Sequence, residues 1–586
     1  MLHYMWQASV LCLQTEKEAI VSPQREWYNI LDFHRFKRFV PQSLSQDKRQ
    51  SFPRNRSERQ TTLLMQRIQC ASIFTDHMVL QQKKPIRIFG YAPEGETVTA
   101  SLLSATGQIL CSGETIASLR DDASFRYNFR LTLPSLPAGG PLTLMVSGQS
   151  GDRITFSDVM IGEVWLAGGQ SNMEFAIGSD KEYAAALQQA PTSNVRFFQV
   201  GQRAFFHENF LEEERSDHWM CGADADFSTW SAVGYYFGAK LAAHLGVTIG
   251  IIGCNWGGTS ACAWQNRDTL ISSEETTVYW TEYEDLLSTL SPETYEAERL
   301  DYIQYQKEWQ PRMDAYYASH PDATWQEAQE AVGVCRWPGP MGPKHEFRPC
   351  GLYETMFSRV VPYTLAGFIY YQGESDDHRP GSYYTLLKNM IGLWRKDFAD
   401  DTLPFLFVQL PMHRYRDNPI TDSWCYLREA QMQVHRDVPH TGLAVAIDCG
   451  EYNNIHPTRK RQVGDRLALQ ALLHVYGLLS EDQAYGPIFH HFETEGTALR
   501  LFFSHADGGF VTCPFPYTES PKTLGFELAG ADGIFHPAVA MLEGNTIVLK
   551  SIDVPAPTQM RYLWVDYREV IPLFGKNGLP LAPFRG

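Results

Sequence analysis

Hydrophobic and polar positions alternate with different spacings along the chain, and the spacing separates regions of different structure. Residues 71–155 show short apolar-polar alternations divided by turn sequences such as Leu-Pro-Ala-Gly-Gly (136–140), which predicts a small β-sandwich. From residue 158 continuous apolar runs alternate with stretches of helical spacing, which predicts a parallel α/β sheet. After about residue 482 the strand-like pattern returns and predicts a C-terminal β-rich region.

The α/β part has a regular order of expected elements. Its expected strands are apolar and run into polar loops, at 164–168, 247–254, 365–373, 404–411 and 442–448. Its expected helices have amphipathic or helical spacing, at 233–246, 382–398 and 461–477. Between them, residues 271–347 are acidic and rich in Tyr and Trp, with long polar helical stretches. We therefore expect a helical insertion in the α/β domain.

These patterns predict four regions. We expect a disordered or non-native leader over 1–68, a β-sandwich over 69–157, an α/β domain over 158–480 with its helical insertion at about 271–347, and a β-rich region over 481–586. The leader is rich in Arg, Lys, Gln and Ser from residue 34 to 69, a composition typical of disorder, with a nucleic-acid-binding arm as the alternative. Met65 is a plausible true start of the protein.

Charge and cysteine content narrow the class of protein. The 586 residues carry a formal net charge of −17, which disfavours nonspecific nucleic-acid binding. The 11 Cys lack CxxC pairs and His-spaced clusters, so structural zinc is not expected. No run of about 18 apolar residues predicts a membrane span. The first 14 residues have no basic segment typical of a signal peptide, so we expect a cytoplasmic location, or a periplasmic or secreted one if the true start lies elsewhere. The oligomeric state does not follow from the sequence.

Polar clusters follow the expected strands of the α/β sheet. They are Gly-Gly-Gln-Ser-Asn-Met (168–173), Asn-Trp-Gly-Gly-Thr-Ser (255–260), Tyr-Gln-Gly-Glu-Ser-Asp (371–376), and Asp448 through Ile-His-Pro (455–457). Open parallel sheets bind ligands at the carboxyl ends of their strands. Together these clusters hold a hydroxyl nucleophile, glycines, amide donors and a histidine, which is the set that acyl transfer through a tetrahedral oxyanion requires.

Ser171 is the favoured nucleophile because it follows a buried strand through a double glycine. The alternative is a plain helix N-cap. Met173 stands where the nucleophile elbow G-x-S-x-G has its last glycine, so the usual α/β-hydrolase motif is absent. Ser260 and Ser375 are rival hydroxyls, since each also lies beside a glycine-bearing turn.

The remaining groups of an acyl-transfer site also have candidates. Gly257 and Gly258 would let a backbone N–H approach the oxyanion, or form a simple turn, and the Gln372 amide could donate to the same oxygen. His456 lies in a loop before the last expected helix and is the candidate base. A metal site is one interpretation of the run Glu374, Asp376, Asp377 and His378. An acidic loop exposed to solvent is the commoner arrangement after a strand, and no metal is predicted.

Four blocks of sequence resemble sialate O-acetylesterases of the SGNH hydrolase superfamily. They are GEVWLAGGQSNME (162–174), NWGGTSACAW (255–264), YYQGESD (370–376) and IHP (455–457). The segments 71–98, 525–540 and 578–585 resemble the family's two ends, so the resemblance runs from about Ala71 to the C-terminus. It implies a flavodoxin-like SGNH hydrolase domain with a parallel sheet, a helical insertion, and flanking N- and C-terminal β domains.

The resemblance also implies the chemistry. Ser171 would attack an acetyl ester and His456 would take its proton, with the Ser171 N–H, Gly257 or Gly258, and Gln372 on the oxyanion. The block residues Gln170, Asn172 and Glu374 are expected to bind substrate, an acetylated sugar or glycan, and no cofactor is expected.

The histidine block departs from the family pattern. SGNH hydrolases often place Asp three residues before the His, and here Asn453 and Asn454 replace the acidic residues. Asp448 or Glu451 could orient the imidazole, or the enzyme could use a Ser-His dyad with a backbone carbonyl as orienter. Two further functions remain open: deacetylation of acetylxylan or another polysaccharide, and, with the two Asn as signs of decay, non-catalytic carbohydrate binding.

Overall fold

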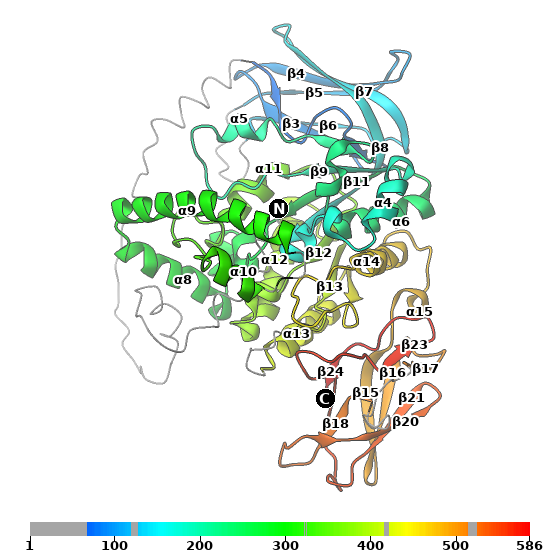
Figure 1. The fold of residues 1–586 in the computed structure, drawn as a ribbon. Helices are drawn as coiled ribbons and strands as arrows, with labels where there is room; N and C mark the ends of the chain where they lie inside the picture. The colour runs from blue at the N-terminus through cyan, green and yellow to red at the C-terminus, as the bar shows by residue number, and fades with distance from the viewer. Residues whose placement is uncertain (1–66, 119–126, 321–322, 324, 415–420, 514–523) are drawn as a thin grey trace, which may run out of the picture.

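The computed structural model describes residues 67–118, 127–320, 323, 325–414, 421–513 and 524–586. Within them the chain forms a mixed α/β core with a large sheet, flanked by β-sheet regions at both ends (Figure 1). The expected leader and Met65 lie outside the described residues. Buried apolar side chains from Ile68 to Phe584 belong to one contiguous cluster, so the central sheet is supported on both sides by the flanking regions.

The N-terminal part consists of two groups of strands. A three-stranded antiparallel sheet is formed by β1 (Gln69–Cys70), β3 (Ile86–Tyr91) and β6 (Phe129–Leu133). Beside it lie β4 (Thr97–Leu103), β5 (Ile109–Ile116) and β7 (Gly139–Gly148). Alternate residues of β4 and β6 are buried, which is the pattern of strands with one face on a core.

One long strand joins the N-terminal part to the central sheet. β8 (Arg153–Gly169) has 17 residues. Its first half pairs with β7 and with β2 (Val79–Gln81), and its second half lies between two parallel strands. Burial changes along it from alternating to continuous, as expected where a sheet becomes covered on both faces. The expected boundary between residues 157 and 158 falls inside this strand.

The central sheet has the strand order β10-β9-β11-β8-β12-β13-β14. Its members are β9 (Val195–Gln199), β10 (Trp219–Cys221), β11 (Ile249–Asn255), β12 (Gly367–Tyr371), β13 (Phe405–Gln409) and β14 (Thr441–Val445), together with β8. All neighbours are parallel except β10 and β9. The five strands expected from apolar runs are thus confirmed, and their carboxyl ends share one edge.

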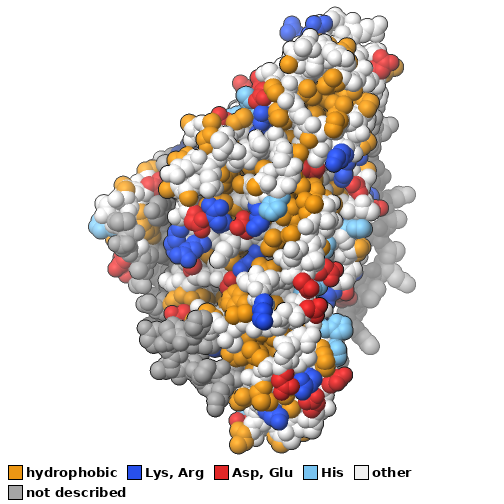
Figure 2. Space-filling view, turned by 90° about the vertical axis from the view of Figure 1, so that its right-hand side faces the viewer, with side chains coloured by type: hydrophobic (Ala, Val, Ile, Leu, Met, Phe, Trp, Pro, Cys, Tyr) orange, Lys and Arg blue, Asp and Glu red, His pale blue; other side chains and the backbone are white. Residues whose placement is uncertain are grey.

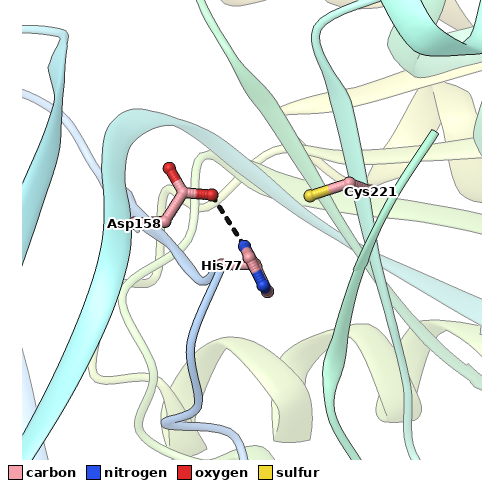
Figure 3. A group of neighbouring side chains, drawn as sticks. All are labelled: His77, Asp158 and Cys221. Atoms are coloured by element: carbon pink, nitrogen blue, oxygen red, sulfur yellow. Dashed lines mark hydrogen bonds and ion pairs between the residues drawn. The ribbon is translucent and has the colours of Figure 1, made fainter. Parts of the chain in front are cut away.

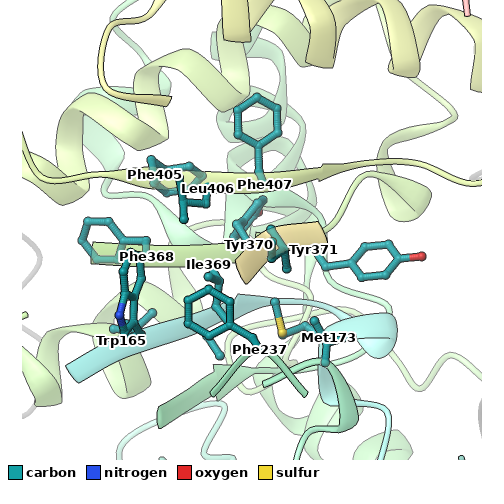
Figure 4. Packing of buried hydrophobic residues seen from close by; sticks show 14 of the residues in the cluster. Trp165, Met173, Phe237, Phe368, Ile369, Tyr370, Tyr371, Phe405, Leu406 and Phe407 are labelled. Atoms are coloured by element: carbon teal, nitrogen blue, oxygen red, sulfur yellow. The ribbon is translucent and has the colours of Figure 1, made fainter. Parts of the chain in front are cut away.

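Helices cover both faces of this sheet. They include α6 (Ala232–Leu245), α12 (Tyr383–Asp397), α13 (Ser423–Asp437) and α14 (Arg461–His474). Trp165 of β8 contacts Phe237 of α6 edge-on, whereas a side chain at Gly168 would collide with Trp394 of α12. Since residues 165 and 168 point to opposite faces of a strand, α6 and α12 lie on opposite sides. Figure 4 shows the side chains between the strands and helices.

The segment between β11 and β12 is largely helical. It contains α7 (Arg267–Leu270), α8 (Glu274–Thr289), α9 (Pro292–Ser319) and α10 (Trp325–Val332). Of these, α8, α9 and α10 lie together at one side of the molecule in Figure 1. Around α9 and α10, Trp309, Met313, Tyr317, Ala328 and Cys335 form a small separate core.

The C-terminal part is made of short strands. Its sheets contain β15 (Ile488–Glu495), β16 (Ala498–Ser504), β21 (Thr546–Lys550) and β20 (Val539–Glu543); β19 (His536–Pro537), β18 (Phe526–Ala529), β22 (Gln559–Tyr562) and β24 (Phe584–Arg585); and β17 (Phe510–Thr512) with β23 (Leu573–Gly575). Arg428 of α13 donates to the Val565 carbonyl at 2.5 Å, and Arg585 pairs with Glu429. These contacts attach the C-terminal strands to α13.

The surface carries charges of both signs. On the face in Figure 2, basic and acidic side chains are interspersed among hydrophobic ones. Among the helices of the described residues, none is both long enough and apolar enough to cross a membrane.

Candidate active site

Ser171 lies at the end of β8, where the strand turns into a short helix. The turn needs glycine, because Gly169 has φ +137° and a Cβ there would lie 2.1 Å from the Tyr371 carbonyl oxygen. The helix α3 (Ser171–Glu174) then begins at Ser171 itself, which is 6 % exposed. The N–H groups of Met173 and Glu174 both donate to Gln170. The Ser171 N–H precedes them in the first helical turn, where backbone donors have no partner within the helix.

Asn172 connects the helix of Ser171 to the loop of His456. Its buried side-chain amide donates to Glu374 Oε1 at 2.6 Å and to the Ile455 carbonyl at 3.0 Å, and its oxygen accepts from Lys460 Nζ. The neighbours of Ser171 and His456 are therefore hydrogen-bonded to each other. The structure brings these two residues, 285 positions apart in sequence, to the same edge of the sheet.

The three expected substrate-binding side chains have partners within the protein. Gln170 Oε1 accepts the N–H of Ser375 at 3.2 Å and, at 3.5 Å, that of Gly373. Asn172 and Glu374 bind each other. All three are at most 5 % exposed. In this structure they hold the loops after β8 and β12 together, and substrate contact stays a prediction for them.

The expected oxyanion donors are also engaged in part. The Gly257 N–H donates to Glu174 Oε2 at 2.6 Å. Gln372 Nε2 donates to Asp376 at 2.6 Å and to the Thr259 carbonyl at 3.2 Å. Because both amide hydrogens of Gln372 have acceptors, this side chain would have to give one up to reach an oxyanion. Gly258, with φ +70°, and the Ser171 N–H are the candidates that need no such exchange.

Asp376 is the residue that holds the second and third sequence blocks together. It is fully buried and accepts from Ser260 Oγ at 2.5 Å, Ala261 N–H at 3.1 Å and Gln372 at 2.6 Å, with the Tyr279 hydroxyl at 3.3 Å. Ser260, a rival nucleophile, also caps η5 (Ala261–Trp264) by accepting from Cys262 N–H. The structure thus gives Ser260 and Asp376 a role in positioning the loops.

Replacing Asp376 by asparagine is expected to lower the free energy of unfolding by about 2–4 kcal/mol, because an amide hydrogen would then face one of the buried donors. Urea unfolding measures the change. The matched control is Asp377→Asn, an exposed neighbour, which should shift stability by less than about 0.5 kcal/mol. Equal effects of the two substitutions would contradict the role of Asp376.

The loop around His456 is fixed by hydrogen bonds to the side chains of two of its own residues, the carboxylate of Glu451 and the amide of Asn454. Glu451 accepts from the Thr458 N–H at 2.9 Å, the Thr458 hydroxyl at 2.8 Å and the Asn454 amide at 2.9 Å. Asn454 in turn accepts the His456 N–H at 3.0 Å. Burial acts to raise the pKa of Glu451, but the hydrogen bonds from Thr458 and Asn454 outweigh it and lower the pKa. Glu451 therefore stabilises the loop backbone that carries His456.

Asp448 has a different partner from the one expected. Both of its carboxylate oxygens bind the Arg466 guanidinium, at 2.5 and 2.7 Å. The pair is largely buried, and Arg466 also donates to the Val445 carbonyl at 2.8 Å. This bidentate pair joins the end of β14 to α14, and orientation of His456 by Asp448 or Glu451 stays a prediction.

Lys460 is a member of the site that the sequence reasoning missed. It is 1 % exposed, donates to Asn172 Oδ1, and its Nζ lies 4.6 Å from the centre of the Phe175 ring. Burial lowers its pKa to about 7, with Glu374 acting in the opposite direction. In the sequence Lys460 lies between Arg459 and Arg461, and a basic run of this kind predicts side chains exposed to solvent. The sequence feature that indicates a place in the site is its separation of four residues from His456.

The substitution Lys460→Met is expected to remove a pH-dependent part of the stability. Lysine in the unfolded chain keeps its proton up to pH 10.5, whereas the folded chain releases it near pH 7. The unfolded state binds more protons in that window, so stability rises with pH by up to about 1.4 kcal/mol per unit from this group. Urea unfolding of wild type and variant at pH 7.5 and 9 measures the slope. Lys388→Met, at an exposed lysine, should keep the wild-type slope, and a wild-type slope in the Lys460 variant would refute the assignment.

Glu174 is a second group with a shifted pKa beside the nucleophile. Burial raises its pKa to about 7, although hydrogen bonds from Gln202 and the Gly257 N–H act to lower it. Its carboxylate joins α3 to the Asn-Trp-Gly-Gly turn through Gly257. Around neutral pH the protonation of Glu174 therefore changes the charge at the Gly257 N–H.

A possible metal-ligand group lies away from these loops. Within the described part of the chain, His77, Asp158 and Cys221 are the one set of three such side chains whose ligand atoms lie within 4.8 Å of one another (Figure 3). His77 Nδ1 is 2.7 Å from Asp158, and Arg196 pairs with the same carboxylate at 3.0 Å. Because the guanidinium already neutralises Asp158, the group is an ion-pair cluster near the start of β8, at the opposite end of that strand from Ser171.

The chain is similar to known carbohydrate esterases. Residues 343–473 match the family model for carbohydrate esterases described as sialic acid-specific acetylesterase. The chain is 26 % identical to mouse sialate O-acetylesterase, over 70 % of this chain and 73 % of that protein, and 24 % identical to the human enzyme, over 70 % and 71 %. Among solved structures, a carbohydrate acetylesterase from Xanthomonas citri has a TM-score of 0.67 and 27 % identity, over 88 % of this chain and 99 % of that one. The chain is thus a carboxylic ester hydrolase that is similar in sequence to sialate O-acetylesterases and in structure to a carbohydrate acetylesterase.

Proposed function

We propose that the chain hydrolyses O-acetyl esters on sialic acid or a related glycan, through an acetyl-enzyme formed on Ser171. The observation that carries the proposal is the hydrogen bond from Asn172 to the Ile455 carbonyl, which places the loops of Ser171 and His456 side by side. The relatives named sialate O-acetylesterase and carbohydrate acetylesterase support the choice of ester.

The strand order supports an SGNH-type, flavodoxin-like domain. Without the edge strands β9 and β10, the sheet reads β11-β8-β12-β13-β14, which in chain order is the 2-1-3-4-5 arrangement of flavodoxin-like folds. In such a sheet the order in which successive strands are added reverses beside the first strand, and ligands bind in the crevice at that point. Ser171 follows β8, that first strand, and the Gln372–Asp376 loop follows its neighbour β12.

The proposed reaction has two steps. Ser171 Oγ attacks the acetyl carbonyl carbon while His456 takes its proton, and the oxyanion is held by the N–H groups of Ser171 and Gly258. The intermediate collapses, His456 returns the proton to the sugar oxygen, and the deacetylated sugar leaves. Water, deprotonated by His456, then attacks acetyl-Ser171; His456 returns the proton to Ser171 Oγ as the acyl bond breaks, and acetate leaves. Each oxyanion donor is worth roughly 3–4 kcal/mol of transition-state stabilisation.

Acetate release from 9-O-acetylated sialic acid, run beside acetylated xylooligosaccharide, tests the proposal. Release from the sialic acid alone is the expected result. Release mainly from the xylooligosaccharide would keep the chemistry and change the sugar to that of a polysaccharide deacetylase. Glycan binding without release of acetate from either would overturn the proposal in favour of a carbohydrate-binding protein.

A further inference from the structure

A cavity of about 630 Å³ opens beside the candidate active site, and the catalytic residues proposed above do not line it. Its lining combines aromatic rings, amides and cations, among them Gln202, Phe205, Trp256, Arg299 and Lys344. The volume is in the range of pockets that hold small organic ligands. Two of these residues, Arg299 on α9 and Lys344 after α10, come from the mainly helical segment between β11 and β12.

The cavity shares a wall with the nucleophile helix. Gln202 Nε2 donates to Glu174 Oε1 at 3.0 Å and to the Asn255 carbonyl at 3.4 Å. Glu174 is the last residue of the four-residue helix that begins at Ser171. Trp256 directly precedes the Gly257–Gly258 turn. A sugar in the cavity therefore lies next to the groups that would hold its acetyl ester.

The cavity lining contains more cationic donors than the protein itself uses. Arg299 donates through Nε and Nη2 to Glu296 at 3.1 and 2.7 Å, and Lys344 Nζ donates to the same carboxylate at 2.7 Å. Two cations thus share one carboxylate. A guanidinium has five N–H donors and an ammonium three, so donors remain on both. The two charged groups also flank the ring of Phe205, at 5.7 and 5.5 Å from its centre.

Two further charged groups of the lining, Arg203 and Glu213, pair with charged or titratable groups of the protein itself. Arg203 pairs with Asp217 through both Nη atoms, at 2.8 Å each. Glu213 lies 3.3 Å from His207, and Glu208 also lines the cavity. On a chain with a net charge of −17, an anionic ligand is repelled at long range. Arg299 and Lys344 are the local positive charge that would make binding of an anion favourable.

We propose that this cavity holds the sugar of the acetylated substrate, and that Arg299 and Lys344 bind a carboxylate carried by that sugar. Trp256 and Phe205 supply the apolar surfaces for its ring and substituents. This role of the cavity rests on the proposed esterase function, but binding of the sugar can be measured separately from catalysis. It gives the segment between β11 and β12 a part in selecting an acidic sugar over a neutral one.

The test is binding of N-acetylneuraminic acid and of its methyl ester, measured by calorimetry with wild type, Arg299→Gln, Lys344→Gln and the double variant. Each lost charge-assisted hydrogen bond is expected to raise the Kd of the acid about tenfold, and the ester should bind wild type as weakly as the acid binds the double variant. Arg312→Gln is the matched control, because Arg312 is an exposed residue of the same helix and should leave both Kd values unchanged.

Equal binding of acid and ester by wild type, or unchanged binding of the acid by the double variant, would overturn the proposal. Hydrolysis of p-nitrophenyl acetate, which has no carboxylate, reports on the esterase separately and should be the same in wild type and in Arg312→Gln. Its absence in wild type would count against the proposed function, while the binding data would still decide the role of the cavity.

Discussion

Replacing Ser171 by alanine is expected to lower kcat for acetyl-ester hydrolysis by about 10⁴- to 10⁶-fold, because the proposed acetyl-enzyme forms on Ser171 Oγ. Ser171 follows the strand β8 at the edge where the loops of Asn255, Gln372 and His456 meet. Removing Oγ leaves the hydrogen bonds of its neighbour Asn172 in place. Substrate binding should therefore persist. Acetate release and the burst phase with p-nitrophenyl acetate measure the loss.

The rival hydroxyls provide the controls for Ser171. Ser260→Ala removes a 2.5 Å hydrogen bond to Asp376 and a helix cap, so it should lower stability by about 1–2 kcal/mol and change kcat by less than about tenfold. Ser375→Ala should keep near-normal activity, because the bond of Ser375 to Gln170 uses its backbone N–H. Loss of the burst in Ser260→Ala or Ser375→Ala, with activity retained in Ser171→Ala, would assign the nucleophile elsewhere.

The position of the site could be predicted from the sequence because it depends on a simple property of parallel sheets. Each expected strand of the α/β part is apolar throughout, and β8, β11, β12 and β14 each run into a polar cluster. Parallel strands end at the same edge, so residues 168–173, 255–260, 371–376 and 448–457 had to meet there. Apolar runs and strand ends contain this information without any knowledge of side-chain direction.

The partners of individual side chains could not be predicted in the same way. Gln170, Asn172 and Glu374 lie in blocks that suggest substrate contact, yet their side chains bind other loops. Asp448 is close to His456 in sequence, but α14 brings Arg466 to it. Such choices depend on how a loop bends and which helix packs over it, which residue spacing does not specify. For the same reason the sequence does not predict that Lys460, in a basic run, is buried at the candidate site.

The length of β8 was likewise outside what the pattern could show. Alternating burial over its first half predicts one kind of strand and continuous burial over its second half predicts another. The change in the spacing of hydrophobic residues predicts a change of domain, whereas the chain continues as one strand of 17 residues through both environments. A hydrophobic pattern reports what covers a strand, and a single strand can have two different surroundings.

Replacing His456 by alanine is expected to lower kcat by about 10⁴-fold or more, since in the proposed mechanism His456 takes the proton of the Ser171 hydroxyl. The ring is 3 % exposed and its loop is held by Glu451 and Asn454. The informative comparison is with the two candidate acids. Loss of an acid that orients the imidazole can cost about 10⁴-fold in kcat, whereas loss of an acid with a structural role changes stability instead.

Asp448→Asn should leave kcat within about tenfold of wild type while lowering the free energy of unfolding by about 2–4 kcal/mol, because it breaks the largely buried bidentate pair with Arg466. Glu451→Gln should lower kcat by about 10- to 100-fold, because the loop carrying His456 loses the carboxylate that accepts from Thr458 and Asn454. Rates of acetate release per folded enzyme, with urea unfolding on the same samples, separate the two effects. A 10⁴-fold loss in Asp448→Asn with unchanged stability would identify Asp448 as the acid of a triad. Small losses in both acid variants, beside the large loss in His456→Ala, would mean that Ser171 and His456 act as a dyad whose imidazole is oriented by the loop backbone.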